Sequence, residues 1–156
     1  MMSDKSQPIP PVTRRLLPAV PWFLKWCGWI NNRWNESVVD ALLVTRDEAA
    51  VMQAWKEVLP EEDLARRLLA AISKEMGWKN ALFIPEDECF VVLKLWWCGF
   101  ADCWERERCM WAFEKILGKR LPSSILPAIV DMTLGDLLRH FRDNAHERPD
   151  LPLVPN

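Results

Sequence analysis

Apolar positions recur at helical spacing along most of the chain and predict an all-α protein. The clearest apolar stripe occupies 61–76, and Gly77 directly after it is a typical helix C-terminal residue. Two capping-box patterns indicate further helix starts. One begins at Thr45, with Glu48 reaching back, and the other at Thr133, with aspartate in place of glutamate.

The segment 13–34 repeats tryptophan at spacings of four, three and five, which roughly keeps the indoles on one face of a helix. This face either packs on the domain behind it or lies in a membrane interface. We favour packing, because the opposite face carries few basic residues. Residues 36–44 are predicted to form a separate short helix.

The run FVVLKLWW at 90–97 is too short for periodicity to distinguish a helix from a strand. We predict a buried short helix or an extended loop, because no clear strand partner exists elsewhere. A stronger helix follows, with Asp102 as its cap and Gly118 at its end. Another short helix is expected over 125–130.

These elements divide the chain into an arm, a helical extension, a helical bundle and a tail. The predicted ranges are 1–12 for a disordered arm, 13–57 for a Trp-rich N-terminal helical extension, 58–145 for the bundle and 146–156 for the tail.

Charge and composition exclude several functions. A net charge of −2 argues against nucleic-acid binding, which normally needs a basic surface. Two histidines, His140 and His146, provide little material for a metal site or for histidine-based catalysis. The five cysteines include no Cys-x-x-Cys pair, so we expect free thiols, no zinc site and a cytoplasmic protein.

Three motifs then point to a family. Asp102-Cys103-Trp104 precedes a helix that ends at Leu117-Gly118, and Leu121-Pro122 and Thr133-Leu134-Gly135-Asp136-Leu137 follow. In order and spacing they resemble the acyl carrier protein family over about 58–145, and also small enterobacterial acyl-carrier-like proteins of unknown function. The resemblance implies an acyl-carrier-like helical bundle with an N-terminal helical extension.

The chain departs from this family at its reactive position. Carrier proteins attach 4'-phosphopantetheine to a serine, whereas Cys103 occupies that position here. Their second helix is acidic, whereas 105–108 alternates glutamate and arginine. We therefore expect no cofactor and no enzymatic activity.

The favoured hypothesis is a protein–protein interaction or regulatory module whose partner is another protein. The expected contact residues are Asp102, Trp104, Glu105, Arg108, Trp111, Trp96 and Trp97. One alternative is a thiol-based or atypical acyl carrier using Cys103, which a helix N-terminus would activate. Another is a membrane-peripheral protein held by the Trp-rich segment 14–34.

Two further groups of residues have competing interpretations. Asp136 and His140, four positions apart, are either an acid–base pair or a surface salt bridge, and we favour the salt bridge. The acidic run 86–88 either binds a cation or caps the next helix, and we favour the cap.

Overall fold

The computed structural model describes residues 8–17, 28–97, 104–121, 125, 127–144 and 146–147. These residues are mostly helical, which confirms the all-α prediction. In chain order the elements are η1 (Arg14–Leu16), α1 (Gly28–Val44), α2 (Glu48–Trp55), α3 (Glu62–Met76), α4 (Cys89–Val92), η3 (Leu95–Trp97), α5 (Trp104–Leu117), β1 (Lys119–Arg120), η5 (Ala128–Asp131), α6 (Leu134–Asn144) and β2 (His146–Glu147).

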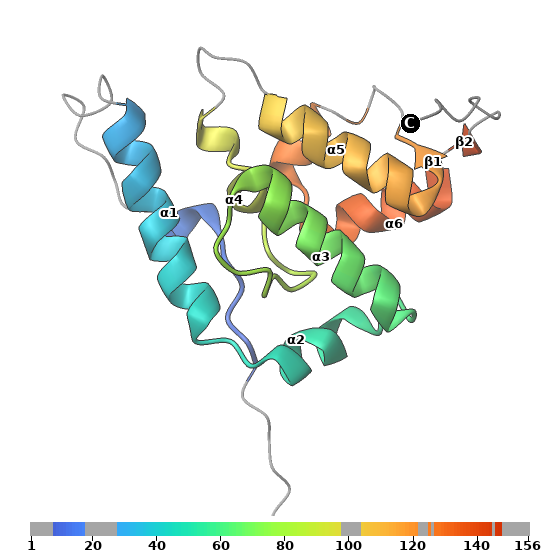
Figure 1. Cartoon of the computed structure of the whole chain (residues 1–156), viewed down its shortest axis with the longest axis horizontal. Helices are drawn as coiled ribbons and strands as arrows, with labels where there is room; N and C mark the ends of the chain where they lie inside the picture. Colours follow the sequence, from blue (N-terminus) through green and yellow to red (C-terminus); the bar gives the residue numbers. More distant parts are fainter. Residues whose placement is uncertain are drawn as a thin grey trace, which may run out of the picture.

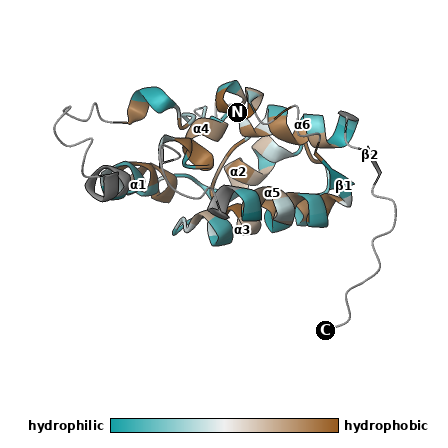
Figure 2. Ribbon diagram, turned by 90° about the horizontal axis from the view of Figure 1, so that it is seen from above, coloured by the Kyte–Doolittle hydropathy of each residue, from teal (hydrophilic) through white to brown (hydrophobic). Residues whose placement is uncertain are grey.

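The helices form two layers. Helices α3 and α5 lie side by side and run antiparallel in one layer (Figure 1). The other layer contains η5 and α6, with the short α4 packed against both (Figure 2). Phe113 of α5 and Phe141 of α6 join the layers, with ring centroids 6.0 Å apart in a T-shaped arrangement. Both rings are fully buried.

Local sequence signals predict several helix ends correctly. Helix α3 ends at Met76, and Gly77 closes it with φ = 68°, a left-handed conformation that favours glycine. The capping box at Thr133 is also confirmed. Its hydroxyl donates to Asp136 Oδ2 at 2.8 Å, and the Asp136 N–H donates back to Thr133 Oγ1 at 3.2 Å.

Two predictions near the N-terminus are wrong. The cap of α2 is Asp47, whose carboxylate accepts a hydrogen bond from the Ala50 N–H at 2.9 Å. The Thr45 hydroxyl instead donates to the Leu42 carbonyl at the end of α1, at 2.7 Å. Helix α1 is continuous over Gly28–Val44, so the predicted short helix at 36–44 is its second half. Residues 18–27 of the tryptophan segment lie outside the described residues.

The apolar run at 90–97 contains two short helices, α4 and η3, which confirms the short-helix alternative. Lys94 lies between them with φ = 50°. Its Nζ donates to Glu36 Oε1 at 2.5 Å and lies 4.4 Å from the ring centroid of Trp78. These contacts satisfy the one charged side chain of the run.

Residues 8–12 are ordered, although the sequence predicts a disordered arm over 1–12. The Val12 side chain is buried in the core. Its N–H donates to Asp87 Oδ1 at 2.7 Å, and its carbonyl accepts from the Glu88 N–H at 3.0 Å. Residues 8–12 are therefore held at Val12 by hydrogen bonds of its backbone groups as well as by apolar contact.

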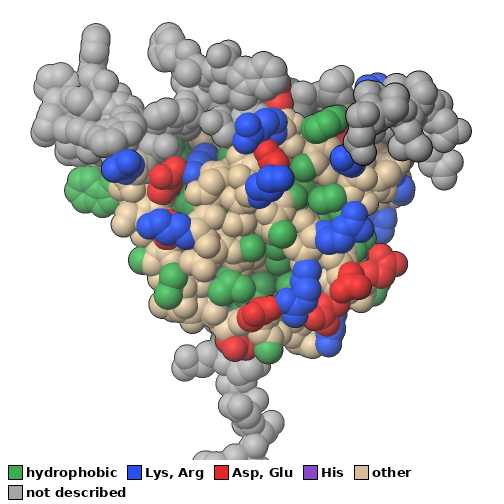
Figure 3. Space-filling view, in the orientation of Figure 1, with side chains coloured by type: hydrophobic (Ala, Val, Ile, Leu, Met, Phe, Trp, Pro, Cys, Tyr) green, Lys and Arg blue, Asp and Glu red, His purple; other side chains and the backbone are tan. Residues whose placement is uncertain are grey.

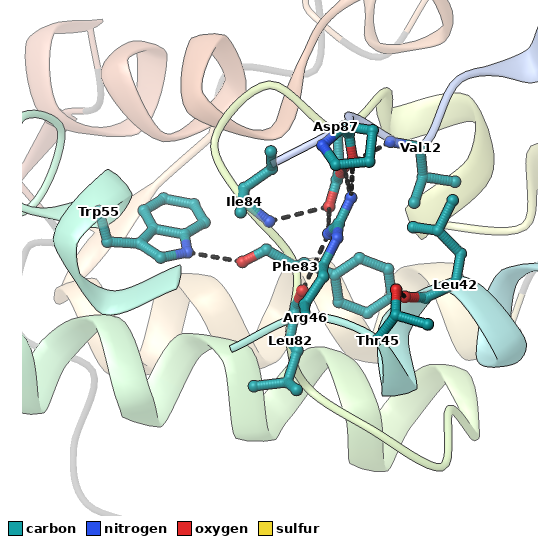
Figure 4. Close-up of polar contacts among 10 residues, drawn as sticks. Val12, Leu42, Thr45, Arg46, Trp55, Leu82, Phe83, Ile84 and Asp87 are labelled. Atoms are coloured by element: carbon teal, nitrogen blue, oxygen red, sulfur yellow. Dashed lines mark hydrogen bonds and ion pairs between the residues drawn. The ribbon is translucent and has the colours of Figure 1, made fainter. Parts of the chain in front are cut away.

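A buried ion pair fixes the same region (Figure 4). Arg46 Nη1 and Nη2 donate to Asp87 Oδ2 and Oδ1 at 2.6 and 2.8 Å. Burial raises the pKa of the Asp87 carboxyl, against the opposing effect of the Arg46 guanidinium. Backbone groups from two segments complete the network: the carbonyls of Pro10 and Leu82 and the N–H groups of Val12 and Ile84.

The N-terminal extension and the bundle share one hydrophobic core. Trp55 of α2 is buried, and its Nε1–H donates to the Phe83 carbonyl at 2.8 Å. Leu43 of α1 lies in the same core. The buried residues of α1 and α2 thus belong to the same core as the buried residues of α3 and α5.

Candidate functional site

Helices α3 and α5 each have one buried side and one side that faces solvent. Leu68 and Ile72 of α3 and Cys109 and Phe113 of α5 are buried. The antiparallel arrangement brings the end of α3 beside the start of α5, where Arg108 Nε donates to Glu75 Oε2 at 2.9 Å. On the solvent-facing side, the side chains along the line where α3 and α5 meet form the border between the two helices.

A groove of about 560 Å³ follows this border. Its apolar lining includes the two small side chains Ala71 and Ala112, one from each helix, which leave the space open. The full lining is Ala71, Lys74, Glu75, Arg108, Trp111, Ala112, Lys115 and Ile116. Figure 3 shows apolar and charged side chains mixed over the face of the molecule that α3 and α5 occupy.

Trp111 is the most unusual residue of the groove, because 59% of this large apolar side chain is exposed. Lys115, one turn further along α5, places its Nζ 6.0 Å from the indole centroid. An exposed indole next to small side chains and cations is typical of a protein-binding surface, where tryptophan is enriched among the residues that contribute most to affinity.

The structure brings two of the predicted contact residues, Arg108 and Trp111, together in this groove. Trp96 is elsewhere and partly buried, with its ring centroid 6.3 Å from those of Trp78 and Phe90. Its predicted role as a contact residue is therefore not supported by its position.

The other predicted contact residues fall outside what the structure describes. Asp102 and Cys103 are not among the described residues, so the thiol-carrier hypothesis has no structural description. For Trp97, Trp104 and Glu105 the backbone is described but the side chain is not.

Sequence reasoning missed Lys74 and Glu75 of α3, and it included Lys115 only as the end of the helix at 102–115 that it expected to dock a partner. One signal was present on α3, where the small Ala71 lies among larger apolar residues and Lys74 and Glu75 follow three and four positions later, on the same side of the helix. A small residue beside charged ones marks a position where a neighbouring helix leaves room. Using that signal requires knowing that α3 packs beside α5, and the periodicity of a single helix does not reveal its neighbour.

A second, smaller hollow of about 360 Å³ lies along α6 and is lined by Met132, Asp136, Arg139, His140 and Asp143. Asp136 does take part in a surface salt bridge, because its Oδ1 accepts from Arg139 Nη1 at 2.8 Å. The pairing with His140 stays a prediction. The Thr133 hydroxyl lowers the pKa of the Asp136 carboxyl, with a smaller contribution from Arg139. A carboxylate held ionised in a helix cap is a poor general acid.

The acidic run at 86–88 is used within the fold. The Asp87 carboxylate pairs with Arg46, and Glu88 Oε2 accepts from Arg14 Nε at 2.9 Å. Glu88 occupies the N-cap position of α4 but makes no side-chain capping hydrogen bond, so the predicted cap is wrong.

The two described thiols, Cys89 and Cys109, are free and buried. Burial raises the pKa of both. They therefore stay in the neutral thiol form at physiological pH, which is a weak nucleophile.

The described part of the chain contains neither a metal-binding cluster nor a membrane-crossing helix. No group of three or more histidine, cysteine or acidic side chains there is placed to hold a metal ion. None of the helices described has the length and apolarity needed to cross a membrane.

Comparison of the chain with protein-family models, with curated proteins and with solved structures finds no match.

Proposed function

We propose that this chain is a non-enzymatic, acyl-carrier-like helical module that binds a partner protein through the groove between α3 and α5. The observation that carries the proposal is Trp111, an indole 59% exposed in a groove with both apolar and charged walls. Binding would bury this side chain, and the small side chains beside it leave room for a partner side chain.

The order of the helices supports the acyl-carrier-like part of the proposal. A long helix (α3), a long connection that contains the short helices α4 and η3, a second long helix (α5), a short helix (η5) and a final capped helix (α6) follow one another. Apart from α4 and η3, this is the order that the family resemblance implies. Cys103 in place of the attachment serine supports a scaffold without the prosthetic group.

The chemistry of the described residues supports a binding role over a catalytic one. The buried thiols have raised pKa values, and the carboxylates of Asp87, Glu88 and Asp136 are engaged in a cap or in ion pairs. The groove itself contains cations, one carboxylate and an exposed indole, a combination suited to recognition.

Affinity capture from the source organism tests the proposal. The full chain and the Trp111→Ala variant are compared, with Trp34→Ala as the matched control, because Trp34 is a tryptophan of α1 that is 53% exposed. Wild type and the control are expected to enrich the same protein, and Trp111→Ala is expected to lose it by about tenfold or more. Equal enrichment by all three forms, or enrichment of nothing, contradicts the proposal.

A further inference from the structure

The groove differs in charge from the rest of the chain. Its lining contains three cations, Lys74, Arg108 and Lys115, and one carboxylate, Glu75, so its net charge is +2. The whole chain has a net charge of −2. Cations are thus concentrated at this groove although the molecule has more acidic than basic residues.

The cations of the groove are incompletely neutralised. Within the described residues, neither Lys74 nor Lys115 forms a salt bridge. Arg108 binds Glu75 through Nε, and 56% of its side chain is exposed. Arg67, one helical turn before Ala71, adds another exposed cation on the same side of α3. The result is a positive border on both helices.

The apolar lining lies between these cations. Ala71, Ala112 and Ile116 surround the exposed indole of Trp111. The lining covers about one turn of α3 (71–75) and about two turns of α5 (108–116), so the groove is long enough for about two turns of a docked helix. A helix placed there presents residues at i, i+3, i+4 and i+7 to the apolar lining, and its flanking residues to the cations on each side.

We propose that the occupant of this groove is an acidic amphipathic helix of a partner protein. A large apolar side chain of that helix packs on Trp111, and its carboxylates pair with Lys74, Arg108 and Lys115. This inference rests on the proposed function and specifies the chemistry of the partner. The charge pairs act mainly on recognition and on the rate of association, and they make binding weaken as salt is added.

A displayed library of random peptides of about 16 residues, long enough for about four helical turns, tests the chemistry directly. Selection uses the full chain, and enriched peptides are then measured by fluorescence anisotropy. The enriched peptides are expected to carry net negative charge and large apolar residues at helical spacing. Enriched peptides that are neutral or basic, or a selection that enriches no peptide, overturn the proposal.

Charge reversal gives the second measurement. The Lys74→Glu/Lys115→Glu variant is expected to weaken binding of the selected acidic peptides by about tenfold or more. The matched control is Arg15→Glu/Lys56→Glu, which makes the same change in net charge at two exposed positions outside the groove. The control is expected to bind like wild type, and equal losses in the two variants contradict the proposal.

The capture experiment separates this inference from the function beneath it. If Trp111→Ala loses the captured protein but the groove charge reversal keeps it, the groove binds a protein of other chemistry and the inference fails. If Trp111→Ala loses nothing, the proposed function fails as well. Self-association that depends on Trp111, seen by sedimentation, or flotation with phosphatidylglycerol vesicles would identify a different occupant and overturn the inference.

Discussion

Asp87 is an acidic residue buried in the core, where a carboxylate is costly unless hydrogen-bond partners replace water. Its two oxygens accept two hydrogen bonds from the Arg46 guanidinium and one each from the backbone N–H groups of Val12 and Ile84. A buried carboxylate is tolerated when such partners replace the water it loses. Arg46 Nε is buried and makes no hydrogen bond to the described residues, so the guanidinium is held by its two Nη groups.

Removing either charge should therefore be costly. Arg46→Ala and Asp87→Ala are each expected to lower the free energy of unfolding by about 3–5 kcal/mol, because the remaining charge is left buried without its partner. The double variant should lose much less than the sum of the two single losses. Urea unfolding followed by tryptophan fluorescence measures all three values.

The exposed Arg66, which pairs with Glu62, provides a matched control, and Arg66→Ala should leave the urea midpoint almost unchanged. Additive losses in the Arg46/Asp87 cycle would show that the two side chains act independently.

Gly135 is fixed by a close approach of backbone. Its N–H donates to the Pro85 carbonyl at 2.8 Å, and an added Cβ would lie 3.0 Å from Pro85 Cβ and 3.1 Å from Pro85 O. Replacing glycine by alanine in a helix normally stabilises it. Gly135→Ala should have the opposite sign and destabilise by about 1–3 kcal/mol, because the loop at Pro85 must move. A higher thermal midpoint in the variant would be evidence against this contact.

At the scale of the element, α6 is the clearest case of a helix specified by its own sequence. Thr133 and Asp136 satisfy each other's polar groups at its first turn, and Leu134, Leu137, Leu138 and Phe141 are buried. Removal of the Thr133 hydroxyl should cost about 1 kcal/mol at neutral pH.

The same cap makes stability depend on pH. The pKa of Asp136 is lowered in the folded state, so its contribution is complete above the ordinary aspartate pKa of 3.8 and is lost as pH falls through the lowered value. Thr133→Ala removes the main cause of that shift. The stability difference between wild type and the variant, measured by urea titration at several pH values, should shrink in acid. A difference that is constant down to the most acidic pH would show that the Asp136 carboxylate is not coupled to the cap.

Structural features whose interacting groups lie within one or two turns of a helix could be predicted from the sequence. Gly77 and the Thr133 capping box are examples, since the groups that interact are close in the chain. The Thr45 prediction was wrong because Asp47, two positions later, is also a good N-cap residue, and it is the residue that caps α2. The Arg46–Asp87 pair and the groove between α3 and α5 could not be predicted, because they depend on which distant segments meet.

At the scale of the whole molecule, the described part of the N-terminal arm, 8–12, is anchored in the core by Val12. Val12 is 1% exposed and lies in the same apolar cluster as residues of α2, α4 and α6. The arm also supplies the Pro10 carbonyl to Arg46 and the Val12 N–H to Asp87. The division into extension and bundle therefore does not correspond to separate cores.

Val12→Ala should lower the free energy of unfolding by about 1–3 kcal/mol, because it leaves a cavity in that shared core. Val44→Ala is the matched control, since Val44 is 67% exposed, and it should have little effect. Thermal unfolding by circular dichroism compares the two. Equal effects at the two positions would contradict the placement of the arm in the core.

The position of the arm also has a consequence for the order in which the newly made protein folds. Val12 and its acceptor Asp87 are 75 positions apart in the chain. At typical rates of protein synthesis, roughly 4 to 15 s pass between the making of the first and the second. The interval is longer still for Arg14, because the Val130 carbonyl to which its side chain donates is 116 positions further along the chain. Val12 and Arg14 are thus made well before the segments that they contact in the folded protein.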